Sequence, residues 1–144
     1  MYAPAVSEEM NYAGDLGLNI GHHDCAHHGS SAGEISALKT INGMHLGLLK
    51  HLINLLKTEG LMKDSLVLFG SDMSDGNTHR TTDIPTLLCG EGADLKFGQV
   101  VSPAAPEPYS KLLNSILSNY GVTVPSMGEG DLLSSANINS TIKT

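Results

Sequence analysis

Four histidines stand within seven positions near the start of the chain, between two glycines. The segment adds one carboxylate and one thiol to the four imidazoles: Gly21-His22-His23-Asp24-Cys25-Ala26-His27-His28-Gly29. Neutral imidazole is the commonest protein ligand for zinc and related metals. Because side chains four residues apart share a face of a helical turn, His23 and His27 are placed to chelate one ion. We predict a metal or phosphoryl-binding site here, and the alternative is a solvated, His-rich loop.

A second polar segment, residues 71–83, directly follows a short apolar run. In open α/β sheets, ligands bind beyond the carboxyl ends of the strands. Asp72, Asp75 and His79 of this segment are therefore placed to reach a metal ion, with Ser71 and Asn77 donating hydrogen bonds. The alternative is an ordinary turn, in which Asp, Gly and Asn are common for conformational reasons.

Each of the two segments is a candidate site for a divalent ion, zinc or manganese. The predicted ligands are His23, His27, His28, Asp72 and His79. The residues predicted to support them are His22, Asp24, His45, Ser71, Asp75 and Asn77. For His45, which lies on the apolar face of a predicted helix, the alternative is a buried histidine with no part in the site. Cys25 is interpreted as a small buried side chain rather than as a ligand.

Two helices are predicted to position these segments. The first covers residues 31–60, because Ser31 and Glu34 have the spacing of a capping box and Gly60 is suited to end the helix. Between them, apolar residues recur at intervals of three and four from Ile35 to Leu56, as on one face of a helix. The second helix covers Pro108–Tyr120, with an apolar side formed by Leu112, Leu113, Ile116 and Leu117.

Two strands are predicted between the helices, at Leu66–Phe69 and Ile84–Cys89. Both runs are continuously apolar, which indicates strands buried on both faces. The order helix, strand, strand, helix is typical of the α/β class. Since so few strands cannot close a core, we expect further sheet from missing chain or from a partner.

Composition limits the possible functions of a chain of 144 residues. A formal net charge of −7 argues against general nucleic-acid binding. No apolar run approaches the roughly 20 residues of a membrane span, and no secretory signal opens the chain. We predict a connector or loop at 1–20, the C-terminal part of one α/β domain at 21–130 and a flexible tail at 131–144.

The segment His22–Gly29 resembles the signature of a bacterial family of unknown function, named for the motif His-x-x-Ser-His-His. The likeness continues in one order through Met44-His45, Leu52–Leu56, Asp64–Ser71, Met73–His79, Ile84–Gly90 and Leu95–Gly98 to Gly121-Val122. Family members are several times longer and typically begin with an export signal. The resemblance therefore implies a C-terminal portion and a periplasmic or secreted location. Ala26 replaces the family's Ser, Asp72 its usual Gly and Thr81 a common second His.

A more distant resemblance is to the alkaline phosphatase and sulfatase superfamily. Its members often have a strand that ends in Asp-His, then a loop His, then a Pro-led strand that ends in Gly-x-Gly. Val67–Asp72, His79 and Ile84–Gly92 follow that order, with Met73 where the pattern has His. This resemblance implies an incomplete alkaline-phosphatase-like sheet with flanking helices.

Together the resemblances imply the metal-binding C-terminal portion of a hydrolase-like domain, acting on phosphate or sulfate esters, in which His23, His27, Asp72 and His79 hold one divalent ion. Because the superfamily's nucleophile belongs to the N-terminal half, we do not expect this chain to be active alone. The expected partner is the missing N-terminal part of the same domain, or a second copy in a homo-oligomer. The alternative is a non-catalytic exported binding or structural protein that keeps the fold without the chemistry, which Ala26, Met73 and Thr81 favour.

Overall fold

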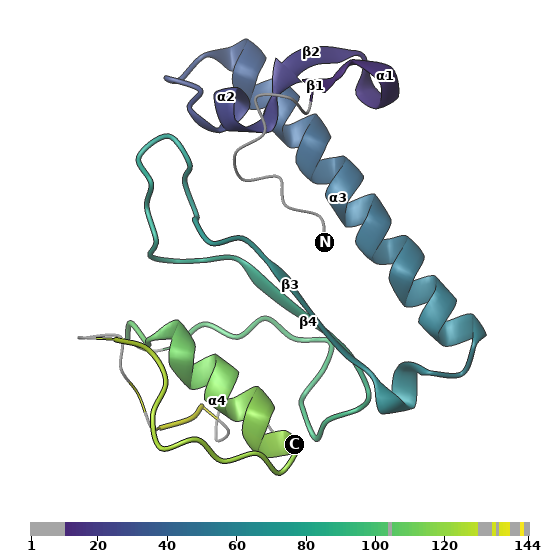
Figure 1. Cartoon of the computed structure of the whole chain (residues 1–144), viewed down its shortest axis with the longest axis vertical. Helices are drawn as coiled ribbons and strands as arrows, with labels where there is room; N and C mark the ends of the chain where they lie inside the picture. The colour runs from purple at the N-terminus through teal and green to yellow at the C-terminus, as the bar shows by residue number, and fades with distance from the viewer. Residues whose placement is uncertain (1–10, 104, 130–133, 135, 139–141, 143–144) are drawn as a thin grey trace. The chain divides into compact units, whose positions relative to one another are not determined.

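The computed structural model describes residues 11–103, 105–129, 134, 136–138 and 142. In chain order the elements are β1 (Asn11–Tyr12), α1 (Ala13–Leu16), β2 (Leu18–Gly21), α2 (His22–Ala26), α3 (Ala32–Thr58), the 3-10 turn η1 (Met62–Asp64), β3 (Leu66–Gly70), β4 (Thr86–Gly90) and α4 (Tyr109–Asn119) (Figure 1). The structure thus confirms a mixed α/β fold. It divides into two units, one with the described residues up to Leu55 and Leu68–Leu87, the other with Leu56–Val67 and the described residues from Leu88 on.

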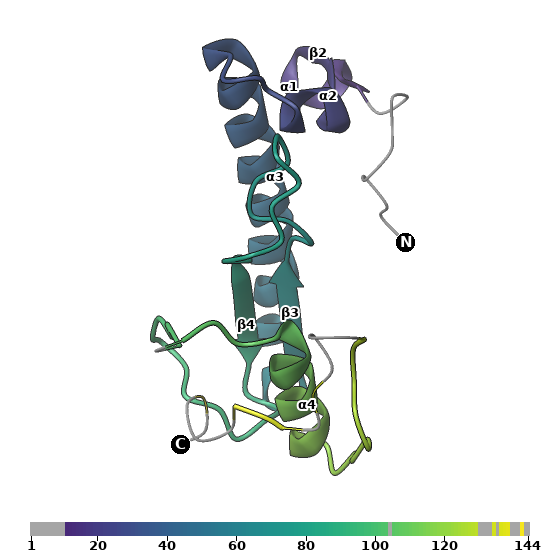
Figure 2. The same ribbon diagram turned by 90° about the vertical axis from the view of Figure 1, so that its left-hand side faces the viewer.

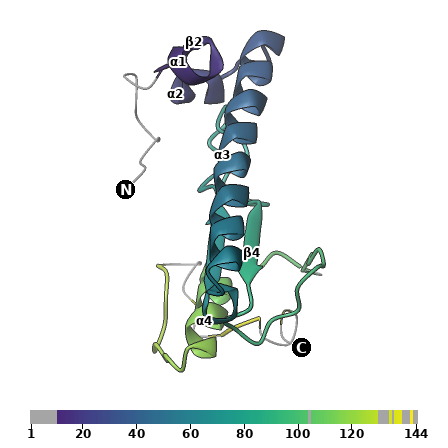
Figure 3. The same cartoon turned by 90° about the vertical axis from the view of Figure 1, so that its right-hand side faces the viewer.

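The long helix α3 matches the prediction for residues 31–60 and runs without interruption (Figure 3). At its start, the Ser31 hydroxyl accepts the N–H of Glu34 at 3.5 Å. At its end, Gly60 has a left-handed φ of +69°, and the N–H of Leu61 donates to the carbonyl of Leu56 at 2.8 Å. These are the bonds with which polar and glycine residues end helices. No helix in the described part of the chain has both the length and the apolar character needed to cross a membrane.

A small core lies at the N-terminal end of α3, where α1, β2 and α2 gather beside it (Figures 1 and 2). Its buried members are Tyr12, Cys25, Ala37 and Ile41, so the interpretation of Cys25 as a buried side chain is confirmed. The partly buried side chains packed against them are Leu16, Leu18, Ile20, Leu38 and Met44. Burial against α3 thus stabilises the antiparallel β1–β2 pair.

Residues 11–20 of the predicted connector therefore have regular structure, where the sequence predicted a loop. Each element there is only two to four residues long, which is too short for an apolar period to show. Gly17, with a φ of +67°, makes the turn between α1 and β2. Residues 1–10 of the connector lie outside the described residues.

The strands β3 and β4 pair in a two-stranded sheet. Near one end, the N–H of Glu91 donates to the carbonyl of Ser65 at 3.1 Å. Near the other, a side-chain carbon at Gly70 would lie 2.8 Å from the carbonyl oxygen of Pro85. The pair is therefore antiparallel, and the polar segment 71–85 connects its two strands.

The prediction that these strands are buried on both faces is wrong for this chain. Leu68 of β3 is 42% exposed and Leu87 of β4 is 46% exposed. A sheet of two strands lacks the neighbouring strands and packed layers that cover apolar side chains. The further sheet that we expected from missing chain or a partner stays a prediction.

The helix α4 lies within the predicted range 108–120, and its apolar side is not its most buried one. Its most buried residues are Ser110, Asn114 and Ser115, whereas the predicted apolar side is only partly buried. The reason is a set of bonds to the C-terminal segment. The Asn114 amide donates to the carbonyls of Ser134 and Ala136, at 2.8 and 3.0 Å, and the Ser115 hydroxyl accepts an N–H at 2.8 Å. These bonds connect described residues of the predicted flexible tail 131–144 to α4.

Candidate functional site

The short helix α2 places its histidines on two sides. One turn of α-helix spans about 3.6 residues, so His23 and His27 lie above one another while His22 points elsewhere. The N–H of His27 donates to the carbonyl of His23 at 3.1 Å, which closes the turn. The two rings pack edge to face with centroids 4.7 Å apart. His23 and His27 are therefore in contact, and their predicted chelation of one ion stays a prediction.

His79 joins this pair from the segment between β3 and β4. Its ring packs edge to face against His27, with centroids 4.7 Å apart and an interplanar angle of 81°. The ring of His27 thus contacts the rings of both His23 and His79. Three of the five predicted ligands form one group, which we call the imidazole group: His23, His27 and His79.

The backbone of His79 has an unusual conformation. Its φ is +52°, in the left-handed region that non-glycine residues rarely adopt, although His is enriched there. Two backbone bonds close the turn around it, from the N–H of Arg80 to the carbonyl of Asp75 and from the N–H of Ser74 to the carbonyl of Arg80, both 2.9 Å. Side chains held in such conformations cluster at functional sites, which is why we include His79 in the candidate site.

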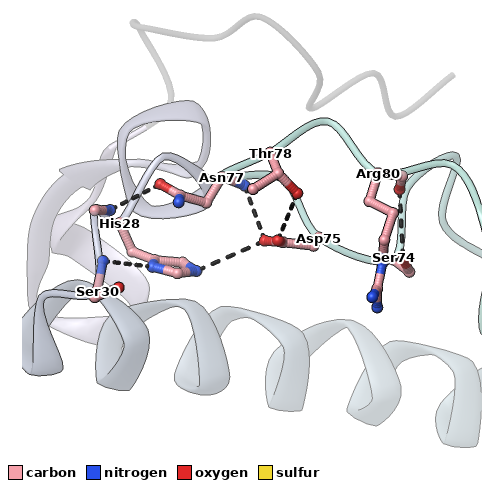
Figure 4. A network of polar contacts seen from close by, with 8 residues as sticks. His28, Ser30, Ser74, Asp75, Asn77, Thr78 and Arg80 are labelled. Carbon is pink, nitrogen blue, oxygen red and sulfur yellow. Dashed lines mark hydrogen bonds and ion pairs between the residues drawn. The ribbon is translucent and has the colours of Figure 1, made fainter.

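His28, also a predicted ligand, faces a carboxylate instead. Its Nδ1 accepts the N–H of Ser30 at 3.0 Å, and its Nε2 lies 3.9 Å from Oδ1 of Asp75 (Figure 4). Asp75 also accepts the Thr78 hydroxyl at 2.7 Å and the Asn77 N–H at 3.1 Å. The Thr78 hydroxyl is the largest cause that lowers the pKa of Asp75, followed among the lowering causes by the Asn77 N–H and the nearby His28 and Arg80 charges. Asp75 therefore supports the turn, whereas its predicted support of metal ligands stays a prediction.

His22 and His45 form a second pair, with ring centroids 6.1 Å apart. Burial lowers the pKa of His22, the neighbouring His23 lowers it further, and the charge of Asp72 opposes both. Burial also lowers the pKa of His45, with an added effect of His22. Asp72, a predicted ligand, thus exerts its electrostatic effect on His22, and it accepts a bond from the Ser71 hydroxyl at 3.4 Å.

Two predicted supporting residues remain. The side-chain oxygen of Asn77 accepts the N–H of Gly29 at 2.9 Å, a link between segments 48 positions apart (Figure 4). Asp24 is exposed on α2, where burial, Glu34 and Asp24, in that order, raise the pKa of the Cys25 thiol. Sequence reasoning missed Thr78 and the bond between Arg80 Nε and the Ser74 hydroxyl, 2.9 Å long. The spacing Asp75-Gly-Asn-Thr, typical of a turn in which Asp accepts the following N–H groups, was the signal available for Thr78.

Among the residues that the structure describes, no three His, Cys, Asp or Glu side chains stand in the geometry of a metal-ligand set. The imidazole group is in ring contact, with His27 and His79 exposed and His23 half-buried. Binding of an ion here therefore requires these rings to leave their present contacts, and exposed side chains change rotamer on the picosecond to nanosecond timescale.

Comparison with protein-family models, curated proteins and solved structures gives no match for this chain. The resemblances to the His-x-x-Ser-His-His family and to the alkaline phosphatase and sulfatase superfamily therefore stay predictions. Function has to be argued from the site itself.

Proposed function

We propose that the imidazole group binds one divalent ion, zinc or manganese, and that this chain is the metal-binding part of a hydrolase-like domain. The observation that carries the proposal is the contact of the His27 ring with both His23 and His79. Two of these side chains come from one helical turn and the third from a distant loop. Histidine in such a convergent group is a common ligand set for zinc.

The chemistry follows from the ligand type. Three neutral imidazoles leave a coordination position of the ion open to water or substrate. An ion held in this way polarises a phosphate or sulfate ester oxygen as a Lewis acid. Within the proposal, the role of His23, His27 and His79 is to bind and orient the ion, whereas the attacking group comes from outside this chain. We therefore expect no ester hydrolysis by the chain alone.

The exposed sheet supports the second half of the proposal. Leu68 and Leu87 project from a sheet of only two strands and are almost half exposed. Apolar side chains in that position are normally covered by further strands or helices. In the proposal, the rest of an alkaline-phosphatase-like sheet covers them, supplied by the N-terminal part of the same domain or by a second copy.

The experiment is elemental analysis of the untagged chain. The protein is first loaded with zinc or manganese and then dialysed against metal-free buffer to remove the unbound ion. We expect about one equivalent of bound ion. His27→Ala and His79→Ala should each abolish it, because each removes one ligand. His51→Ala is the matched control, since His51 is exposed on α3 outside the group, and should leave the metal content unchanged. Equal metal content in all four proteins contradicts the proposed site, and phosphate or sulfate ester hydrolysis by the isolated chain contradicts the proposed dependence on another part.

The second candidate function is a non-catalytic binding or structural protein. The observation that favours it is that no preformed metal-ligand set exists among the described residues. In that case the exposed histidines bind zinc weakly and in several places, and His27→Ala lowers the bound amount only in proportion to the histidines removed. The same elemental analysis therefore separates the two functions.

A further inference from the structure

The turn 74–80 contacts the end of α2 and the loop that follows it at three points, and Figure 4 shows the contact that involves His28 and Asp75. Asn77 Oδ1 accepts the N–H of Gly29 at 2.9 Å. Asp75 Oδ1 lies 3.9 Å from Nε2 of His28. The third contact is the backbone of Gly76 against Ala26. Because backbone hydrogen bonds between Ser74, Asp75 and Arg80 close the turn, its residues pack against this region as one rigid segment.

Position 76 favours glycine because Ala26 leaves no room for a side chain, and not because of the backbone conformation. A side-chain carbon there would lie 2.8 Å from Cβ of Ala26 and 3.3 Å from its carbonyl oxygen. The first distance is shorter than real carbon contacts, so alanine at 76 forces the turn and the loop apart. Gly76 does not have a left-handed φ, and the backbone itself therefore accepts alanine.

This contact is adjacent to the imidazole group. Ala26 directly precedes His27, and Gly76 belongs to the closed turn that carries His79. The rings of His27 and His79 are already in contact at 4.7 Å between centroids. A small separation of the turn from Ala26 therefore moves His79 away from His27, while His27 stays beside His23 through the bond of its N–H to the His23 carbonyl.

We propose that Gly76 and Asn77 are positioning residues for His79, an inference that rests on the proposed metal site. Gly76 allows the turn to approach Ala26, and Asn77 fixes it through the N–H of Gly29. Neither residue is a ligand to the ion. Both determine whether the third imidazole reaches the other two.

The test uses the full chain and two readouts. The first is the nuclear Overhauser effect between the ring protons of His27 and His79 in metal-free protein. The second is the affinity for Zn²⁺. We expect Gly76→Ala to abolish the ring–ring signal and to weaken zinc binding by about tenfold or more, as for other residues that orient metal ligands. The double variant Gly76→Ala with Ala26→Gly removes the clashing carbon and should restore both.

The matched control is Gly43→Ala, because a side-chain carbon at Gly43 meets no atom within 4 Å. It should change neither readout, and circular dichroism of α3 checks that every variant is folded. Asn77→Asp keeps the accepting oxygen and should keep the ring–ring signal, whereas Asn77→Leu should lose it. This pair is compared by the ring signal only, since an added carboxylate itself attracts cations.

The outcomes separate this inference from the proposed function. If the parent chain binds no zinc but its ring signal follows the pattern above, the metal proposal fails and the positioning role stands. If the parent binds zinc and Gly76→Ala leaves the ring signal and the affinity unchanged, the positioning role is overturned and the metal proposal stands. Loss of the ring signal that Ala26→Gly does not restore also overturns the steric role of Gly76.

Discussion

The charge of Asp75 is set by a few neighbouring groups at the tip of the β3–β4 connection. The Thr78 hydroxyl donates to its Oδ2 at 2.7 Å and the Asn77 N–H to its Oδ1 at 3.1 Å. Hydrogen bonds to a carboxylate stabilise its ionised form, which is why the pKa of Asp75 lies below its usual value. The ionised carboxylate in turn keeps the turn closed beside His28.

Thr78→Val tests this arrangement, because valine keeps the shape of threonine and removes the donor. We expect the pKa of Asp75 to rise toward its ordinary value, as measured by carbon NMR of the carboxyl group. A carboxyl group whose pKa is lower in the folded than in the unfolded state stabilises the fold at every pH above the pKa of the unfolded state. That contribution is lost as the pH falls through the folded value, so Thr78→Val should also lose less stability on acidification.

Thr81→Val is the control for this measurement. Thr81 is exposed in the same loop and is not among the groups that lower the pKa of Asp75. Its replacement should leave the carboxyl titration as it is in the parent chain. Identical titration curves for the parent, Thr78→Val and Thr81→Val would contradict the role of the Thr78 hydroxyl.

At the scale of elements, α4 shows how a polar helix face becomes the buried one. Asn114 and Ser115 are buried because they bond to described residues of the segment 134–138. A buried amide with its partners removed costs more than an exposed one, since it cannot bond to water instead. The helix and the C-terminal segment therefore stabilise one another.

Asn114→Leu should lower the free energy of unfolding by roughly 1–3 kcal/mol, because the carbonyls of Ser134 and Ala136 lose their donor. Urea unfolding with α4-specific amide exchange measures the change. Ser102→Ala, an exposed serine in the preceding loop, should stay within about 0.5 kcal/mol of the parent. A variant at position 114 as stable as the Ser102 variant would show that these bonds contribute nothing.

The same scale shows what the sequence predicts and what it does not. The helix α3 is predictable because Ser31, Gly60 and the apolar spacing between them all indicate the same element. The pairing of His23 with His27 is predictable because it depends only on helical spacing. The resemblance to the alkaline phosphatase and sulfatase superfamily places His79 in one site with His27, but the packing of the two rings cannot be read from the sequence, because it joins segments distant in the chain. The burial of Asn114 and Ser115 in α4 is not readable from the sequence either, because their partners lie about 20 residues further along the chain.

At the scale of the whole molecule, apolar side chains remain uncovered in the unit that carries the site. Leu48, Leu52 and Leu55 continue the apolar face of α3 beyond the small core, and each is more than 40% exposed. Leu68 and Leu87 are similarly exposed on the sheet. Exposed apolar groups of this kind are typical of surfaces that another chain or segment covers. The unit therefore positions a site without closing a core around it.

Two opposing effects determine how the stability of the molecule responds to acid. The chain has a net charge of −7 with its histidines neutral, so protonation reduces the overall repulsion and favours the fold. His45 acts in the opposite direction, because burial, and then His22, lower its pKa. A histidine whose pKa is lower in the folded state than in the unfolded state does not lower the free energy of unfolding at a pH above the unfolded pKa. Its cost grows as the pH falls from there to the folded value and is then complete.

His45→Gln should therefore reduce the loss of stability between about pH 7 and pH 5, because glutamine cannot take up a proton. The measurement is the midpoint of thermal unfolding of parent and variant across that range. His51→Gln is the matched control on the same helix, since His51 is exposed, and its curve should run parallel to that of the parent. If His45→Gln also runs parallel to the parent, burial of His45 does not contribute to the acid response.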